Sequence, residues 1–347
     1  MTKVALIGYG YWGPNLVRNL AMLPDHVLYG VADVRQDRLA AAQRLYPGVI
    51  VTQDFRLFLE DAAVDGIVLA TPPRTHACLT KEALLHDKHV MVEKPLAMTS
   101  ADAEELIELA ERRDRVLMVG HTFLYSPPVR KLRDLVLSGE LGELLYVYGE
   151  RLNLGRVRDD VDVLWNLGPH DISILLYLLG RMPERVSAIG YTYLQPGIAD
   201  VTFMDLQFPG EVRAHMHLSW LDPGKVRRMT VVGREKMVVY DDTNADMQIA
   251  VYDKGMTPAN LVREAPSFET YQEFQLIVRS GDVHIPKVDA TEPLRIECAH
   301  FIACIEGRES CLTDGQHGLQ VVHVLEGALH SMEHDGKWVE VSRSVRE

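Results

Sequence analysis

The sequence predicts an α/β protein with two domains: a first domain on a parallel sheet, then an α+β domain on a mostly antiparallel, open sheet. Three observations predict this class. The chain has 347 residues, a length typical of two domains. Residues 1–121 alternate short apolar runs with helical segments, the pattern of a parallel sheet covered on both faces. Residues 122–347 begin with helical stretches and continue with segments of alternating polarity, which are typical of antiparallel strands.

The elements of the first domain follow from its apolar periodicity. Strands are expected at 4–7, 27–32, 67–70, 89–92 and 116–119, and helices at 13–23, 37–46, 75–85 and from 100 onward. Pro24 ends the first helix, because proline cannot continue the hydrogen-bonded backbone. Asp102, Glu104 and Glu105 suit the first turn of the last helix, where the helix dipole is positive.

The second domain changes from helical to alternating patterns. Helices are expected at 126–138 and 163–179, and strands at 144–152 and 338–341. Between 185 and 252 the sequence shows alternating segments, such as 202–208, 212–218 and 229–232, which predict antiparallel strands. The turn pairs Pro209-Gly210 and Pro223-Gly224 divide the alternating region. Two further helices, at 292–307 and 317–334, are free to pack back on the first domain.

The composition excludes several classes of function. A net charge of −13 argues against non-specific nucleic-acid binding, which needs clustered positive charge. No apolar run approaches the length of a membrane span, and no signal peptide is visible. The cysteines match no zinc template and are too sparse for a disulfide scaffold; they are Cys78, Cys298, Cys304 and Cys311. We therefore expect a cytoplasmic protein with free thiols and no metal, nucleic-acid or membrane partner.

A glycine-rich turn, Gly8-Tyr9-Gly10-Tyr11-Trp12-Gly13, follows the first strand and opens the first helix. The first glycine allows a tight turn, the second lets the backbone approach a pyrophosphate, and the third lets the helix pack on the strand. Asp33 lies 20 residues after Gly13, where an acidic side chain binds the adenosine ribose and repels a 2′-phosphate. The turn therefore predicts a dinucleotide site of the Rossmann type, with NAD favoured over NADP, although Arg35 is placed to meet a phosphate.

Two further tripeptides follow predicted strands, Thr71-Pro72-Pro73 and Glu93-Lys94-Pro95. Ligands of open α/β sheets bind beyond the carboxyl ends of the strands, so both tripeptides are expected to face the cofactor. Each proline is also an ordinary way to end a strand. Together with the glycine turn they support one cofactor site.

These motifs, with His76 and a helix that carries His170-Asp171, resemble those of the Gfo/Idh/MocA family (glucose-fructose oxidoreductase, inositol dehydrogenase and rhizopine-catabolism proteins). The likeness extends over essentially the whole chain, through Glu292-Pro293-Leu294 and Asp314-Gly315. It implies an NAD-dependent oxidoreductase acting on a sugar hydroxyl. The cofactor residues that it implies are Gly8, Tyr9, Gly10, Tyr11, Trp12, Gly13, Asp33, Thr71, Pro72, His76, Glu93 and Lys94.

Some stretches resemble a narrower branch, the UDP-N-acetylglucosamine and UDP-N-acetylglucosaminuronate 3-dehydrogenases. These stretches are 10–15, 121–125, 151–155 and 165–171. The resemblance implies chemistry at C3 of a sugar or nucleotide sugar. The expected substrate-binding residues are Lys94, Arg151, Asn153, Asn166 and His170.

Oxidation of a secondary alcohol needs a hydride acceptor and a proton acceptor. His170 is the expected proton acceptor, because histidine titrates near neutral pH. Lys94 is expected to hydrogen-bond the same oxygen and to stabilise its developing negative charge. Arg151 and Arg158 are expected either to meet a substrate anion or to form ion pairs.

Asn166 is the departure from the family pattern, because similar dehydrogenases carry aspartate four residues before the histidine. Residues 166 and 170 lie one helical turn apart and share a face. Asparagine keeps the shape of aspartate but loses the charge that favours a protonated histidine. The change is compatible with tolerated, altered or engineered chemistry, and we expect dehydrogenase activity below that of an aspartate variant.

The family resemblance leaves other functions open. One is an inositol or free-sugar dehydrogenase, another is a non-redox enzyme that recycles tightly bound NAD, and a third is a non-catalytic NAD-sensing regulator. Alternating apolar residues in the second domain, Met229-Val231 and Met237-Val239, favour a homodimer or homotetramer assembled through its sheet.

Overall fold

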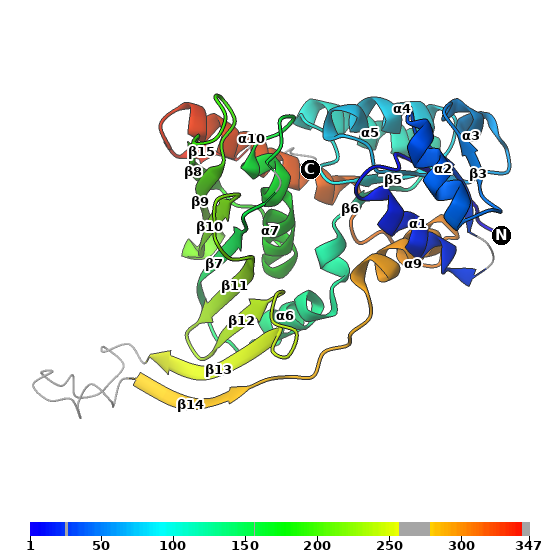
Figure 1. Cartoon of the computed structure of the whole chain (residues 1–347). Coiled ribbons are helices and arrows are strands. Elements are labelled where there is room, and N and C mark those ends of the chain that lie inside the picture. The colour runs from blue at the N-terminus through cyan, green and yellow to red at the C-terminus, as the bar shows by residue number, and fades with distance from the viewer. Residues whose placement is uncertain (25–26, 156, 257–277, 342–347) are drawn as a thin grey trace, which may run out of the picture. The chain divides into compact units, whose positions relative to one another are not determined.

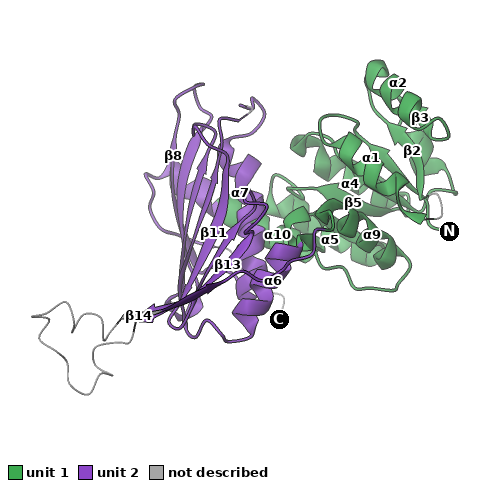
Figure 2. Cartoon of the chain, turned by 60° about the horizontal axis from the view of Figure 1, so that its bottom comes forward, with its two compact units in different colours: residues 1–126, 291–326 green, residues 127–290, 327–347 purple. Residues whose placement is uncertain are grey.

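The computed structural model describes residues 1–24, 27–155, 157–256 and 278–341, with the side chains of 256 and 278–280 left out. The chain forms two compact units (Figure 2). Unit 1 comprises residues 1–126 and 291–326, and unit 2 comprises 127–290 and 327–347. The first unit is therefore built from two separate stretches of chain, and the second begins at Pro127 rather than at residue 122.

Unit 1 is built on a six-stranded parallel sheet in the order β3-β2-β1-β4-β5-β6 (Figure 1). The strands are β1 (Val4–Ile7), β2 (Leu28–Ala32), β3 (Ile50–Thr52), β4 (Gly66–Leu69), β5 (His89–Glu93) and β6 (Leu117–Gly120). This order is that of a Rossmann domain, in which the direction of winding reverses between β1 and β4. The parallel sheet of the sequence prediction is confirmed.

Helices cover both faces of this sheet because the strands are apolar on both sides. They are α1 (Gly13–Ala21), α2 (Gln36–Leu45), α3 (Arg56–Glu60), α4 (His76–Leu85), α5 (Ser100–Arg113), α9 (Pro293–Ile305) and the first part of α10 (Gly315–Glu333), with short turns η2 (Pro73–Thr75) and η3 (Thr122–Tyr125). Helices α3, α4 and α5 contribute to one core cluster, and α1, α2 and α9 contribute to a second.

The structure adds two elements that the sequence analysis missed in this unit, β3 and α3. Strand β3 has only three residues, at an edge of the sheet, and its residues are half-buried or exposed. Helix α3 has five residues, of which only Phe58 and Leu59 are buried. Segments this short show too little apolar periodicity to be recognised.

Unit 2 is built on a nine-stranded mixed sheet in the order β14-β13-β12-β11-β7-β10-β9-β8-β15. Its strands are β7 (Leu144–Leu152), β8 (Arg185–Tyr191), β9 (Val201–Gln207), β10 (Arg213–Ser219), β11 (Val226–Gly233), β12 (Met237–Asp241), β13 (Ile249–Met256), β14 (Val278–His284) and β15 (Val339–Glu340). Its helical elements are α6 (Pro127–Leu137), α7 (Val163–Leu179), the short turn η4 (Pro209–Glu211) and the last part of α10. Only β7 and β10 pair in parallel, so the expected mostly antiparallel sheet is confirmed.

One face of the second sheet packs on helices α6 and α7, and the other is open. Strand β10 shows the division: Ala214, Met216 and Leu218 are buried, whereas Arg213 and His215 are exposed. We expected Met229 and Val231 to support association, but both are buried within the unit, each 1% exposed. That part of the expectation is wrong, because these two side chains already belong to the core.

None of the helices in the described parts of the chain is long and apolar enough to cross a membrane.

Candidate functional site

The glycine-rich turn between β1 and α1 leaves room for a ligand only above its middle glycine. Gly8 has φ +99°, and a Cβ there would lie 2.7 Å from the Ala70 carbonyl oxygen. A Cβ on Gly13 would lie 2.4 Å from the Gly8 carbonyl oxygen. A Cβ on Gly10 would meet nothing within 4 Å among the described residues. Gly8 and Gly13 are therefore required by packing, whereas the bare backbone at Gly10 faces open space that suits a pyrophosphate.

The other residues of the turn differ in exposure. Tyr9 is buried, and Tyr11 is 82% exposed. Helix α1 begins without a side-chain cap in the described structure. Pro14 has no N–H and the Asn15 N–H donates to the Trp12 carbonyl oxygen at 2.9 Å, so it is mainly the positive end of the helix dipole that the helix offers to phosphate oxygens. The residues present therefore fit a dinucleotide.

Asp33 lies beside this turn, directly after β2. Its Oδ2 accepts a hydrogen bond from the Tyr9 N–H at 2.6 Å, and its Oδ1 accepts from the Arg35 N–H at 2.8 Å. A carboxylate has four acceptor sites, so it can still accept from ribose hydroxyls. The Arg35 guanidinium donates to Asp37, with Nη2 2.6 Å from Oδ2. That ion pair engages the Arg35 guanidinium, which could otherwise bind the 2′-phosphate of NADP.

Trp12 joins the glycine turn to the end of β5. Its Nε1–H donates to Glu93 Oε1 at 2.6 Å. Burial raises the pKa of Glu93 to about 7, although Lys94 and the Trp12 hydrogen bond act in the opposite direction. Lys94 is half-buried and follows β5 directly, with a cis peptide bond to Pro95. The turn, Glu93 and Lys94 thus lie together at the carboxyl ends of strands β1 and β5.

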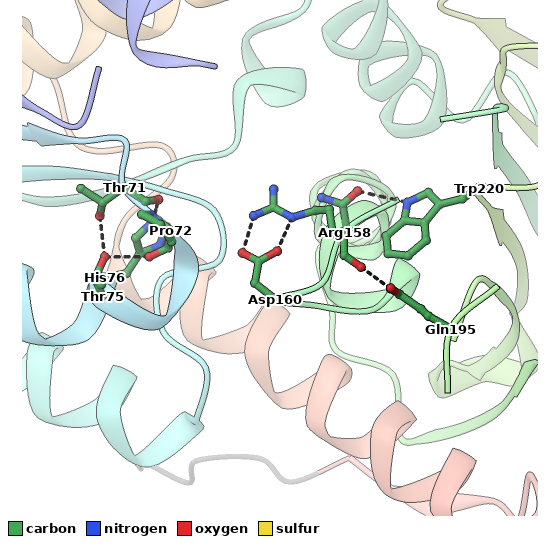
Figure 3. A network of polar contacts seen from close by, with 9 residues as sticks. Thr71, Pro72, Thr75, His76, Arg158, Asp160, Gln195 and Trp220 are labelled. Carbon is green, nitrogen blue, oxygen red and sulfur yellow. Dashed lines mark hydrogen bonds and ion pairs between the residues drawn. The ribbon is translucent and has the colours of Figure 1, made fainter. Parts of the chain in front are cut away.

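His76 lies between the backbone segments that follow β4 and β5 and does not direct a ring nitrogen at a ligand (Figure 3). Its Nδ1 lies 2.7 Å from the Pro95 carbonyl oxygen and its Nε2 2.9 Å from that of Thr71, and the residue is 1% exposed. Thr75 Oγ1 lies 2.8 Å from both Thr71 Oγ1 and the Pro72 carbonyl oxygen. Our expectation of a direct cofactor contact by His76 does not suit this arrangement, because each ring nitrogen faces a backbone carbonyl oxygen, to one of which the ring N–H donates, and neither is directed at a ligand.

A buried group of titratable side chains beside β6 escaped the sequence analysis. Glu297 of α9 is fully buried; its Oε2 accepts from Thr122 Oγ1 at 2.7 Å, and its Oε1 has no partner among the described residues. Burial raises the pKa of Glu297 well above its ordinary range, and Glu93 adds to the effect. The rings of His121 and His317 meet edge to face at 5.1 Å, and burial lowers both pKa values. Only the contact between the two stretches of unit 1 brings these groups together.

In unit 2, helix α7 carries two half-buried polar side chains on one face. Asp162 caps the helix by accepting from the Trp165 N–H at 2.8 Å, and the helix is buried over most of its length. Asn166 and His170, one turn apart, are half-buried on this face. Asn166 Oδ1 accepts from Nε1–H of Trp220 at 3.3 Å, which orients the amide (Figure 3). The two residues expected to act on substrate thus lie on one face of one helix.

Arg151 has a different role from the expected one. Its Nε and Nη2 donate to the two carboxylate oxygens of Asp171 at 2.7 and 2.9 Å, and the two side chains are only 5% and 7% exposed. A guanidinium held this way ties β7 to α7 and is not presented to a substrate anion. Arg158 likewise donates to Asp160, and its carbonyl oxygen accepts from Gln195 (Figure 3).

Asn153 remains available for a ligand. It follows β7, and its backbone N–H donates to the Ser219 carbonyl oxygen at 3.1 Å. Its side-chain Oδ1 is buried and has no hydrogen-bond partner among the described residues. A buried oxygen without a donor is costly unless a ligand supplies one. The expectation that Asn153 binds substrate therefore stays a prediction with a physical reason.

Two family models match the chain. The model described as "Oxidoreductase family, NAD-binding Rossmann fold" matches residues 2–121, and the "GFO/IDH/MocA C-terminal domain" matches residues 129–239. Together they include the glycine turn, Lys94, Asn166 and His170.

Individual proteins resemble the chain over different spans. The UDP-N-acetylglucosamine 3-dehydrogenase of Acidithiobacillus ferrooxidans is 28% identical over 92% of this chain and 94% of its own length. The myo-inositol 2-dehydrogenase of Thermotoga maritima is 28% identical over 54% of this chain, which spans only 58% of that protein. The crystal structure of a putative oxidoreductase from Magnetospirillum magnetotacticum is 29% identical, with a TM-score of 0.79 over 94% of this chain and 99% of that one.

Proposed function

The chain belongs to the Gfo/Idh/MocA family of oxidoreductases with an NAD-binding Rossmann fold, and from this premise we propose that it oxidises a secondary hydroxyl of a sugar or nucleotide sugar at C3. The same site would run the reverse reduction. The observation that carries the proposal is the polar pair on α7, where Asn166 and His170 are half-buried one turn apart on a helix whose other side chains are mostly buried and apolar. A helix with only a packing role would bury that face with apolar side chains.

NAD is the proposed redox partner. Gly10 and the first turn of α1 would hold its pyrophosphate, and Asp33 would accept hydrogen bonds from the adenosine ribose. The ion pair between Arg35 and Asp37 supports NAD over NADP. When bound, the nicotinamide ring supplies the hydride acceptor.

The protein's own residues would handle the proton. His170 accepts the hydroxyl proton, and the Lys94 ammonium donates a hydrogen bond to the same oxygen as negative charge develops on it. Asn166 holds the substrate or the imidazole through its amide, which Trp220 orients. Asn153 donates to, or accepts from, a substrate hydroxyl through its amide.

The choice of a nucleotide sugar rests on the relatives. The UDP-N-acetylglucosamine 3-dehydrogenase matches this chain over almost its entire length, whereas the inositol dehydrogenase matches a little more than half. That difference supports a substrate with a sugar C3 hydroxyl and an attached anionic nucleotide diphosphate over a free inositol.

The proposal is tested by incubating the protein with NAD and a panel of UDP-sugars, dTDP-sugars, free sugars and inositols while NADH absorbance is recorded. We expect NADH formation with one nucleotide sugar and a 3-keto product by mass spectrometry. His170→Gln and Lys94→Met are expected to lower kcat by about 10²- to 10⁴-fold while NAD binding persists. Turnover without net NADH would indicate recycled cofactor, and NAD binding with no turnover on any sugar would contradict the proposal.

We also propose that two copies associate through the open face of the unit 2 sheet. Aromatic side chains gather there: Phe203 stacks on His217 at 4.4 Å between ring centroids and meets Tyr191 edge to face at 6.2 Å. Met237 and Val239 lie on the same face, opposite Val232 and Thr230 in the sheet register. An apolar and aromatic sheet face of this kind supports a protein partner.

A further inference from the structure

Two cysteines and a histidine converge at the end of α9, outside the groups assigned to the proposed reaction. His300 and Cys304 lie one helical turn apart, and Cys311 returns to them from the loop before α10. Their ligand atoms (His300 Nε2 or Nδ1, Cys304 Sγ, Cys311 Sγ) all lie within 4.8 Å of one another. Cys304 is buried, Cys311 is half-buried, and the His300 side chain is 10% exposed.

The separations match those of ligands on a small, soft metal ion. His300 Nε2 lies 3.4 Å from Cys304 Sγ. In a tetrahedral zinc site with ordinary bond lengths, nitrogen and sulfur ligands lie about 3.6 Å apart and two sulfurs about 3.8 Å apart. Cys311 Sγ is near enough to complete the set by rotation about its side-chain bond. Thiolate and imidazole together are the ligands that zinc prefers.

Glu309 provides the support that metal-binding histidines have. Its Oε2 lies 2.8 Å from His300 Nδ1. A carboxylate at Nδ1 holds the proton there and leaves the lone pair on Nε2, the nitrogen on the side of Cys304, which is the usual arrangement behind a zinc-bound histidine.

We propose that His300, Cys304 and Cys311 bind one zinc ion, with water as the fourth ligand. In the structure the Leu312 N–H donates to His300 Nε2 at 3.1 Å. On metal binding, Nε2 gives up this hydrogen bond to coordinate the ion, and the protons of the Cys304 and Cys311 thiols are released to solvent. The ion would tie the end of α9 to the loop at 309–312, which continues into the backbone contact between Thr313 and Val119 of β6. It would therefore hold in place the loop that leads into this contact between the second and first stretches of unit 1.

Cobalt(II) substitution tests the site, because thiolate ligands give a charge-transfer band in the near ultraviolet and tetrahedral Co²⁺ absorbs in the visible. The reduced, metal-free whole chain is titrated with Co²⁺ and then with Zn²⁺, and the bound metal is quantified by inductively coupled plasma mass spectrometry. We expect one equivalent, both absorption features, their loss on adding zinc, and a higher Tm with zinc.

The variants separate this site from other ways of binding metal. Cys304→Ser and Cys311→Ser are expected to lose the charge-transfer band and the zinc-dependent Tm rise, whereas Cys78→Ser, at an exposed cysteine elsewhere, keeps both. Glu309→Gln changes an exposed side chain and is expected to weaken metal affinity about 10-fold or more without unfolding the protein. Changing His330 and His334 to Gln removes an exposed cluster of other metal-ligating side chains and should leave the thiolate band intact.

Three outcomes would overturn the proposal. One is a wild-type protein with no thiolate-to-cobalt band. Another is an equal zinc content in wild type and Cys304→Ser. The third is formation of a Cys304–Cys311 disulfide, with the loss of two hydrogens in the intact mass, in protein that takes up no metal when reduced. None of these results depends on turnover, so the zinc site and the proposed dehydrogenase activity can fail separately.

Discussion

Asn166 is the residue on which the strength of the proposed chemistry depends. Its amide oxygen already accepts the Trp220 indole N–H, a bond that an aspartate carboxylate would also accept. Substitution by aspartate therefore keeps the geometry and adds only a negative charge on the face that carries His170. A carboxylate within about 4–6 Å of an imidazole raises the pKa of the histidine by roughly 1–3 units.

Asn166→Asp is expected to increase NADH formation about 10-fold at alkaline pH. The reason is that the stronger base accepts the hydroxyl proton more readily. The acid limb of the kcat/KM profile should move up by about one pH unit, because His170 must lose its proton to act. Steady-state rates between pH 5 and pH 10 on the substrate found by the panel measure both effects. An unchanged limb together with an unchanged rate would count against a role for this charge.

Single residues were predictable from sequence where a local backbone rule applied. The glycine turn requires Gly8 and Gly13 by direct contact, and the spacing of the motif was enough to find them. The partners of Arg151 and His76 were not predictable, because Asp171 lies 20 residues from Arg151, and Pro95 lies 19 residues from His76. The site at His300 was missed for a related reason: cysteine spacings alone do not include the histidine one turn away.

At the scale of elements, helix α9 brings a buried carboxyl group against the end of β5 and β6. Glu297 is fully buried and has a raised pKa, whereas in the unfolded chain it ionises near its ordinary value of 4.5. As the pH rises above 4.5, the unfolded state loses this proton first. The unfolded state is then favoured, so Glu297 makes the native state less stable toward neutral pH.

Glu297→Gln is expected to raise Tm, with a gain that is small near pH 4 and grows toward pH 8. Glutamine keeps an acceptor for Thr122 Oγ1 and has no proton to lose. Thermal unfolding by circular dichroism across this pH range measures the difference. Glu60→Gln, at an exposed position of α3, serves as the control and should give no such trend. A Tm gain independent of pH would show that ionisation of Glu297 is not the cause.

Elements were predictable in proportion to their length and regularity. The long helices α5 and α7 and the buried strands were found because their periodic patterns extend over whole segments. Helix α7 and strands β1 and β7 have the predicted bounds, whereas the ends of other predicted strands differ by one to three residues. Strands β3 and β14 were not found. Strand β3 is short and half-buried or exposed, and the described side chains of β14 are exposed. Neither strand therefore shows a clean alternation of buried and polar residues.

At the scale of the whole molecule, the open face of the unit 2 sheet predicts association. Phe203 is 38% exposed on this face and contacts both Tyr191 and His217. Phe203→Asp is expected to shift the protein from dimer or tetramer to monomer, because a carboxylate buried in an interface without a partner is costly. Sedimentation velocity measures the change.

Leu137→Asp provides the matched control, since Leu137 is an exposed apolar residue of α6, away from that face. It should leave the sedimentation coefficient unchanged. A wild-type chain that sediments as a monomer at all concentrations would remove the basis for sheet-mediated association.

The division into two units has a consequence for how the protein is made. Residues 291–326 complete unit 1, and α9 supplies Leu294, Phe301 and Ile302 to the same core as β1 and α1. A nascent chain emerges from the ribosome in order, so the N-terminal stretch must wait, with part of its core uncovered, until all of residues 127–290 have been synthesised. During translation, the strands of unit 2 from β7 to β14 can therefore pair before the dinucleotide-binding unit is complete, and residues 327–347, which include β15, join unit 2 last. Premature termination anywhere before α9 should leave an aggregation-prone product rather than a smaller working domain.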